Sequence, residues 1–212
     1  MRARRGSLGT TAPVIGVIGP IGSGKSTVSK RLAERGAVVV DADRLTRDVM
    51  APGTSTTDEI VARFGVEFRL ADGSLDRPAL GRVVFADPER LAVLEAIVHP
   101  AVADLERATV LGADAARPKA IVLEAIKLVE AGHAAWCDEI WLVECSPATQ
   151  LTRLVGRGMA EPDARQRIAA QQASLPLWRA AASRVIDTDG SLHTVERAVA
   201  EAFEEVLAGW VG

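Results

Sequence analysis

The glycine-rich stretch GPIGSGKST, Gly19–Thr27, constrains the fold more than any other part of the chain. Its glycines, lysine and serine follow the P-loop spacing. The apolar, β-branched run Val14–Ile18 precedes it, and Lys25–Gly36 follows with the spacing of an amphipathic helix. A glycine loop between a buried strand and a helix predicts an α/β fold with an anion site at the helix N-terminus.

Each residue type in this loop has a physical role. Glycines adopt backbone conformations closed to other residues, and they let main-chain amides approach phosphate oxygens. The amino group of Lys25 can reach the β- and γ-phosphates, and the hydroxyl of Ser26 can bind Mg²⁺. The alternative is a glycine-rich turn that happens to precede a helix. We expect ATP and Mg²⁺ as ligands, with a nucleotide site made of Gly19, Gly22, Ser23, Gly24, Lys25, Ser26 and Thr27.

Four more apolar runs predict strands. They are Ala37–Val40 (ending at Asp41), Ala120–Ala125, Glu139–Val143 and Arg184–Asp187. Helices are expected over residues 44–50, 56–64, 77–85, from 88 onward with a kink or break at Pro100, 147–157, 162–172, and 191–208 with Ser191 as its cap. Strands separated by helices predict a five-stranded parallel sheet flanked by helices. The helical block 44–113 is too long for a simple crossover and predicts a partial subdomain.

Composition limits the remaining possibilities. The chain has 212 residues and a net charge of −3, which does not favour a nucleic-acid binder. Its two cysteines, Cys137 and Cys145, have no metal-type spacing and are typical of thiols in a reducing cytoplasm. No stretch is long enough to span a membrane. We expect a cytoplasmic monomer with residues 1–12 as a disordered tail.

The sequence also separates classes of P-loop protein. The chain contains no asparagine, so the Asn-Lys-x-Asp guanine motif of GTPases is absent. The third predicted strand carries Glu124, where large mechanical ATPases have an aspartate. A short chain with a helical subdomain and a later arginine-rich helical pair is typical of nucleotide or small-metabolite kinases. In such enzymes the pair, here residues 147–172, closes as a lid over ATP.

Several stretches carry a closer likeness. They are DADRLTRDVMAPG (41–53), ARFG (62–65), DGSLDRPALGRVVFADPERLAVLEAIVHPAV (72–102), TQLTRLVGRG (149–158) and RIAAQ (167–171). Together they resemble the dephospho-coenzyme A kinase family, over residues 13–212. The Leu-Asp-Arg and His-Pro elements between Leu75 and Pro100 are specific to that family.

The resemblance implies the last step of coenzyme A biosynthesis, in which ATP phosphorylates the ribose 3′-hydroxyl of dephospho-coenzyme A. It also implies a P-loop kinase core, a helical acceptor subdomain and a lid. Asp43, just past the second strand, matches the family's catalytic aspartate, and a helix N-cap is its other, compatible role. Arg153 matches the lid arginine that stabilises the transferring phosphoryl group, and its alternative is an exposed helical arginine. Lys25 completes the predicted catalytic set.

Other positions keep two interpretations each. Asp41 supports Mg²⁺ through water or holds a neighbouring loop. Arg47 faces the acceptor's phosphates or forms a surface salt bridge. His99 binds the acceptor or makes a buried hydrogen bond. Arg157 is a second, weaker lid candidate.

The chain departs from the family pattern at two sites. Lys127 replaces a hydrophobic residue after the third strand, and it either binds an acceptor phosphate or points into solvent. Thr188 replaces an asparagine in a loop expected near the adenine, which puts base recognition there in question. Neither change is expected to touch the P-loop, Asp43 or Arg153, so we expect an active enzyme. The alternatives are a kinase for another nucleotide or nucleoside, and a non-catalytic nucleotide-binding switch.

Overall fold

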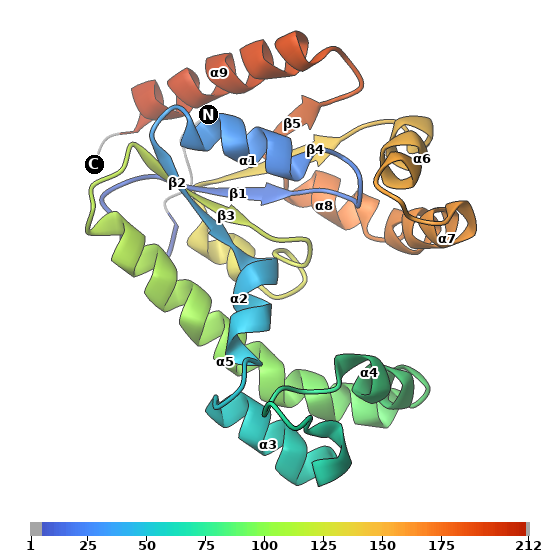
Figure 1. The fold of residues 1–212 in the computed structure, drawn as a ribbon. Coiled ribbons are helices and arrows are strands. Elements are labelled where there is room, and N and C mark those ends of the chain that lie inside the picture. Colours follow the sequence, from blue (N-terminus) through green and yellow to red (C-terminus); the bar gives the residue numbers. More distant parts are fainter. Residues whose placement is uncertain (1–5, 211–212) are drawn as a thin grey trace. The chain divides into compact units, whose positions relative to one another are not determined.

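The structure is a computed structural model that describes residues 6–210. Its sheet consists of β1 (Val14–Ile18), β2 (Ala37–Asp41), β3 (Ala120–Glu124), β4 (Glu139–Glu144) and β5 (Arg184–Asp187). The strand order is β2-β3-β1-β4-β5, and every pairing is parallel (Figure 1). The predicted five-stranded parallel sheet is therefore confirmed. Strand β1 lies at its centre, so the loop that follows β1 leaves from the middle of the carboxyl edge.

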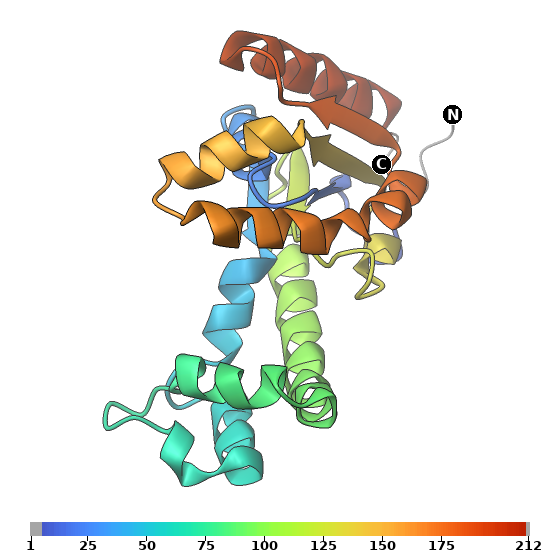
Figure 2. The ribbon, with the colours of Figure 1, turned by 90° about the vertical axis from the view of Figure 1, so that its right-hand side faces the viewer.

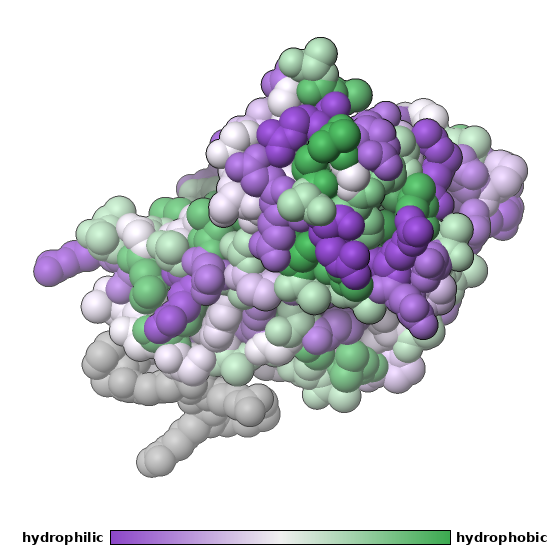
Figure 3. Space-filling view, turned by 90° about the horizontal axis from the view of Figure 1, so that it is seen from below, coloured by the Kyte–Doolittle hydropathy of each residue, from purple (hydrophilic) through white to green (hydrophobic). Residues whose placement is uncertain are grey.

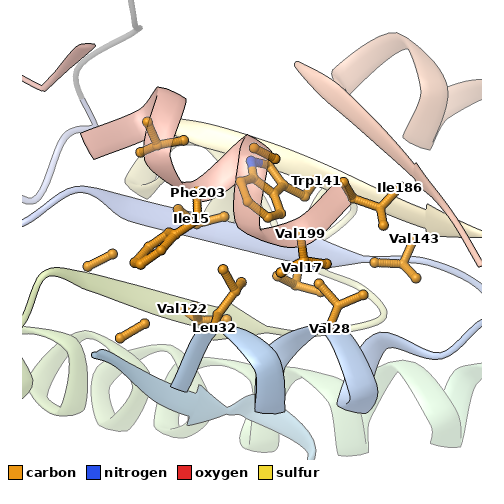
Figure 4. Close-up of a cluster of buried hydrophobic side chains, with 14 of the residues drawn as sticks. Ile15, Val17, Val28, Leu32, Val122, Trp141, Val143, Ile186, Val199 and Phe203 are labelled. Atoms are coloured by element: carbon orange, nitrogen blue, oxygen red, sulfur yellow. The ribbon is translucent and has the colours of Figure 1, made fainter. Parts of the chain in front are cut away.

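One face of the sheet is covered by two helices, α1 (Lys25–Ala33) and α9 (Leu192–Gly209). Val28 and Leu32 of α1 and Phe203 of α9 point toward the strands, where Trp141 and Val122 are also buried (Figure 4). Burying side chains of this size contributes roughly 1.5–3 kcal/mol each. Ser191 caps α9 as predicted, because its hydroxyl accepts a hydrogen bond from the Thr194 amide.

Three further helices belong to the same compact unit, which comprises residues 6–41 and 110–210 of the described chain. Helices α6 (Pro147–Gly156) and α7 (Glu161–Gln172) lie side by side (Figure 2) and share a small apolar cluster. Helix α8 (Leu175–Ala181) was not predicted, because seven residues give too little periodicity. Its Trp178 is buried, and the indole donates a hydrogen bond to Glu130 Oε1 at 2.9 Å.

The segment before β1 differs from the predicted disordered tail. The buried carboxylate of Asp138 accepts hydrogen bonds from the amides of Gly6 (2.6 Å) and Val14 (2.7 Å). Asp114 accepts from the amides of Thr11 and Ala12. Main-chain amides of the segment 6–12 thus donate hydrogen bonds to carboxylates that are distant in the sequence. Residues 1–5 of the predicted tail lie outside the described chain.

The second compact unit, residues 42–109, is helical, and its bounds lie within four residues of the predicted 44–113 subdomain. It contains α2 (Ala42–Val49), α3 (Ser55–Phe64), the 3-10 turn η1 (Val66–Phe68), α4 (Arg77–Phe85) and most of α5 (Pro88–Asp114). The Leu-Asp-Arg element has a structural role here. Leu75 is buried, Asp76 caps α4 by accepting from the Ala79 amide, and Arg77 donates to the carbonyl of Arg47.

Pro100 does not divide α5, so the predicted break at this proline is wrong. Helix α5 runs for 27 residues with Pro100 inside. Val98 and Val102 flank the proline and are both buried in the core of this unit. Their burial offsets the roughly 3 kcal/mol that an interior proline costs a helix.

The described surface is mixed in character. Hydrophobic and hydrophilic residues are interspersed on the face drawn in Figure 3. Val66 and Phe85 are the most exposed large hydrophobic residues described, each 79% accessible. Within residues 6–210, every helix is too short or too polar to cross a membrane.

Candidate active site

The stretch Gly19–Ser26 runs from the end of β1 into the first turn of α1, and its three glycines all have positive φ. Gly19 has φ 149°, and a Cβ there would lie 2.1 Å from the Val143 carbonyl oxygen of β4. Gly24 has φ 97° and is the N-cap of α1. The loop conformation thus needs glycine at Gly19 for space and at Gly24 for its left-handed backbone.

Lys25 folds back over the loop. Its Nζ donates to the carbonyl oxygens of Gly19 at 2.8 Å and Pro20 at 3.2 Å. Ser26 is the second residue of α1, and its side chain is exposed. A cationic ammonium and an exposed hydroxyl therefore stand at the positive end of the helix dipole, as an anion site requires.

The carbonyl groups of the loop face the protein. Arg153 of α6 donates from Nη1 to the carbonyl oxygens of Gly22 and Ser23, both at 3.2 Å. The hydroxyl of Thr188 donates to the Ser23 carbonyl oxygen at 2.5 Å. Ser23 itself is fully buried, and its amide donates to the Pro20 carbonyl oxygen.

Two glutamines hold the peptide groups of Ile21. Gln150 of α6 donates from Nε2 to the Ile21 carbonyl oxygen at 2.8 Å. Gln171 of α7 accepts from the Ile21 amide at 2.6 Å. The Ile21 side chain also packs on the apolar cluster shared by α6 and α7. Sequence reasoning missed both glutamines, although they lie inside the stretches TQLTRLVGRG and RIAAQ.

These hydrogen bonds leave several main-chain amides of the loop as donors for a ligand. The amides of Gly22, Gly24 and Ser26 take part in none of the loop's hydrogen bonds within residues 6–210. With the carbonyls tied to α6 and Thr188, the unpaired donors belong to one short loop at a helix N-terminus. Such an arrangement can bind phosphate oxygens without bringing carbonyl dipoles against them.

A cavity of about 140 Å³ adjoins the start of α1. It is lined by Gly24, Thr27, Arg153, Arg157, Thr188, Gly190, Leu192 and Val195. Two arginines, small residues and two apolar side chains give it both polar and apolar walls. Arg157, the second predicted lid arginine, is exposed at the end of α6 and lines this cavity.

The surroundings of Arg153 differ from those of an exposed helical arginine. It is neither a solvated helical arginine nor wholly directed toward a ligand, because its guanidinium is bonded to the loop and to Thr188. Nη1 also donates to Cys145 Sγ at 3.6 Å. Burial raises the pKa of the Cys145 thiol, with the nearby Arg153 charge opposing that rise. Both cysteines are free thiols.

Asp43 lies in the first turn of α2, second in the helix, and its side chain is exposed. It is therefore not the residue before the helix, as the N-cap interpretation required. Asp43 follows the last residue of β2 by two positions, so chain connectivity keeps it near that strand's carboxyl end. An acid in the first turn is favourable with the helix dipole.

The three predicted acceptor-binding residues besides Asp43 are all exposed. Arg47 forms no ion pair with an acid of residues 6–210, so the surface salt bridge expected as its alternative is absent. The His99 side chain is 62% accessible, with Nε2 4.0 Å from Glu95 Oε1, so the buried hydrogen bond expected as its alternative is wrong. Lys127 lies in a turn after β3, where its carbonyl accepts from Ala131.

Carboxylates gather beside the loop in one place. Asp41 at the end of β2 is the register partner of Glu124 on β3, and Glu124 is in turn the partner of Val17 on β1. Within residues 6–210 no group of three or more His, Cys, Asp or Glu could enclose a metal. Magnesium that keeps several waters and takes phosphate oxygens fits a single hydroxyl such as that of Ser26.

Comparisons with known proteins agree on one family. The model of the family described as CoaE, dephospho-CoA kinase, matches residues 13–194. A Streptomyces avermitilis protein named dephospho-CoA kinase is 46% identical over 194 residues, which are 91% of this chain and 93% of the relative.

Solved structures match as well. A crystal structure from Thermus thermophilus is 34% identical, with a TM-score of 0.73 over 95% of this chain and 99% of that one. Dephospho-CoA kinase from Campylobacter jejuni has a TM-score of 0.63 at 19% identity, over 92% of this chain and 97% of that one, which shows a common fold.

Proposed function

The chain belongs to the dephospho-CoA kinase family, and on that premise we propose that it transfers the γ-phosphoryl group of ATP to the ribose 3′-hydroxyl of dephospho-CoA. The products are CoA and ADP. The observation that carries the proposal is the loop Gly19–Ser26, whose carbonyls are tied back while three amides and Lys25 stand at a helix N-terminus. That loop is suited to the β- and γ-phosphates of a nucleotide.

The transfer forms a bond between the acceptor oxygen and the γ-phosphorus and breaks the bond to the β,γ-bridging oxygen. Charge spreads over the equatorial oxygens of the moving group, so positioning and electrostatics do most of the work. Lys25 leaves the Gly19 and Pro20 carbonyls and moves to the phosphates when ATP binds. The loop amides donate to the same oxygens.

Asp43 orients the acceptor hydroxyl and receives its proton late in the transfer, then releases it to water. Its place two residues beyond β2 supports this role, since ligands of such sheets bind outside the carboxyl ends of the strands. Arg47, His99 and Lys127 are exposed and carry hydrogen-bond donors. We assign them to the acceptor's phosphates and to the rest of its surface.

The cavity beside Gly24 and Thr27 is suited to the nucleoside of ATP. Arg157 lines it and supplies a planar cation that can stack on a base. Arg153 retains N–H donors on Nε and Nη2 beyond its bonds to the loop, and these are available to the transferring phosphoryl group. Helices α6 and α7 then act as the lid of the nucleotide site.

Magnesium would be held by the Ser26 hydroxyl, with Asp41 reaching it through water. When bound, the ion neutralises charge on the β- and γ-phosphates. We also propose that the protein works in the cytoplasm, where its thiols stay reduced, and as a monomer of 22.4 kDa.

A panel of acceptors tests the proposal. ADP release is measured with ATP, Mg²⁺ and, in turn, dephospho-CoA, AMP, adenosine and shikimate. We expect turnover with dephospho-CoA that exceeds the others by at least a hundredfold in kcat/KM. Preference for AMP or adenosine would instead indicate a nucleotide or nucleoside kinase. ATP binding without transfer to any acceptor would indicate a nucleotide-binding switch.

A further inference from the structure

Thr188 lies directly after β5 and is 3% exposed, although the sequence placed it in a loop that reads the base. Its hydroxyl does not point at an open surface. It donates to the Ser23 carbonyl oxygen at 2.5 Å and accepts from Arg153 Nη1 at 3.0 Å. Its main-chain carbonyl oxygen accepts from Arg153 Nη2 at 2.6 Å.

The hydroxyl therefore serves as a bridge. A hydroxyl has one hydrogen to donate and two lone pairs to accept with. The Glu144 carbonyl oxygen also lies 3.3 Å from the Thr188 hydroxyl, but the Ser23 carbonyl oxygen is much nearer, and Arg153 donates to the lone pairs. Arg153 bonds the carbonyl oxygens of both Gly22 and Ser23, so Thr188 and Arg153 hold the Ser23 carbonyl together, and Arg153 alone holds that of Gly22. The Ser23 carbonyl shares a planar peptide group with the Gly24 amide, so these bonds set where the Gly24 amide points.

The same geometry limits what Thr188 can do for base recognition. A Cβ on Gly24 would lie 3.5 Å from both Thr188 Oγ1 and Arg153 Nη1, so this bridge packs against the loop backbone itself. A hydroxyl committed to a carbonyl oxygen and a guanidinium has no hydrogen left for a purine. Thr188 contacts the loop, and through the loop it acts on the phosphates.

We propose that Thr188 is a positioning residue for the phosphate loop. Together with Arg153 it fixes the Gly22 and Ser23 carbonyls against the protein, which keeps the loop amides turned toward the phosphates of ATP. This role rests on the proposed kinase function for its ligand. An asparagine at this position could supply the same kind of donor through its side-chain amide.

The test compares Thr188→Val with Thr188→Ser and Thr188→Asn. Valine keeps the shape and removes the hydroxyl, serine keeps the hydroxyl, and asparagine supplies an amide donor. Thr152→Val is the matched control, because Thr152 is an exposed threonine of α6 that bonds only within its helix. ATP affinity is measured by calorimetry without any acceptor, and KM for ATP, KM for dephospho-CoA and kcat are measured separately.

We expect Thr188→Val to weaken ATP binding at least tenfold and to raise KM for ATP by a similar factor, with KM for dephospho-CoA within twofold. Serine and asparagine should keep ATP affinity within about threefold of the wild type, and Thr152→Val should leave it unchanged. A folded Thr188→Val protein that binds ATP within twofold of wild type would overturn the proposal. So would an equal rise of both KM values, which indicates a general structural defect.

If the valine variant fails to fold, Thr188→Ala takes its place against serine, with the same expected difference and the same contradicting result. If wild-type protein binds ATP but phosphorylates no dephospho-CoA, the kinase assignment fails while the calorimetric series still decides the role of Thr188. If every variant keeps normal turnover and unaltered ATP affinity, the positioning role of Thr188 is refuted and the kinase assignment stands.

Discussion

Three glycine-to-alanine substitutions are expected to change stability by different amounts, and in different directions. At Gly19 an alanine meets two costs. A φ of 149° disfavours an L-residue, and its Cβ would lie 2.1 Å from the Val143 carbonyl oxygen, which belongs to the neighbouring strand. Strained backbone and overpacking each cost roughly 1–3 kcal/mol, so we expect Gly19→Ala to lose about 4 kcal/mol.

Gly24 and Gly112 separate these two costs. At Gly24 the backbone is left-handed but the nearest atom to a Cβ is 3.5 Å away, so only the conformational cost of about 1–2 kcal/mol applies. Gly112 lies inside α5 with nothing within 4 Å of a Cβ. Alanine there should stabilise the protein by about 0.5–1 kcal/mol, because glycine is a poor helix former.

Urea unfolding followed by tryptophan fluorescence measures these differences. All four tryptophans, Trp136, Trp141, Trp178 and Trp210, lie in the unit that contains the glycines, so their signal reports that unit. A loss below 1 kcal/mol at Gly19 would refute the claim that the loop conformation is fixed by contact with β4. Equal losses at Gly19 and Gly24 would show that backbone conformation alone accounts for the effect.

Other predictions concern chemistry and pH. Asp43→Asn should lower kcat by a hundredfold or more and keep ATP affinity within twofold of the wild type. The control Asp48→Asn, at an exposed position near the end of the same helix, should leave kcat near normal. Comparable kcat values in the two variants would contradict the proton-acceptor role of Asp43. The raised pKa of Cys145 should make its alkylation by iodoacetamide at pH 8 slower than that of a free thiol, and a rate at or above the free-thiol rate would contradict the burial. Hydrogen bonds from the Thr149 side chain and the Ser146 amide lower the pKa of Asp189. The ionised Asp189 therefore stabilises the fold above its unfolded pKa, near 3.9, and this contribution is lost as the pH falls through the lower folded pKa. Melting temperatures between pH 7 and pH 3 should therefore fall less steeply in Asp189→Asn than in wild type.

The strands and the phosphate loop could be predicted because their signals are local. Val14–Ile18 is apolar and β-branched, the glycine spacing follows at once, and Ser191 precedes a clear amphipathic helix. These patterns depend on neighbours within a turn or two along the chain. The residues that match them adopt the predicted structure.

Features that depend on distant partners could not be predicted. Continuity of α5 through Pro100 depends on the burial of Val98 and Val102 in the core of their own unit. The role of Asp138 depends on amides more than a hundred residues earlier. No local pattern carries such information.

In the candidate site, too, local motifs could be predicted and contacts between distant residues could not. The loop residues were predicted from their motif, whereas the partners of Arg153 were not, because they come from the loop, from Cys145 and from Thr188. Thr188 was noticed as a departure from the family, but only the fold brings its hydroxyl to the Ser23 carbonyl. The functions of Asp43, Arg47, His99 and Lys127 stay predictions.

The identity of the phosphorylated atom tests the central claim most directly. Purified protein is given ATP and Mg²⁺ with either dephospho-CoA or its 3′-deoxy analogue, and the product is identified by mass and by phosphorus resonance. We predict CoA with one ADP per product from the first substrate, and no phosphorylated product from the analogue. Transfer to the 3′-deoxy compound, or no CoA from dephospho-CoA under conditions where ATP binds, would contradict the account.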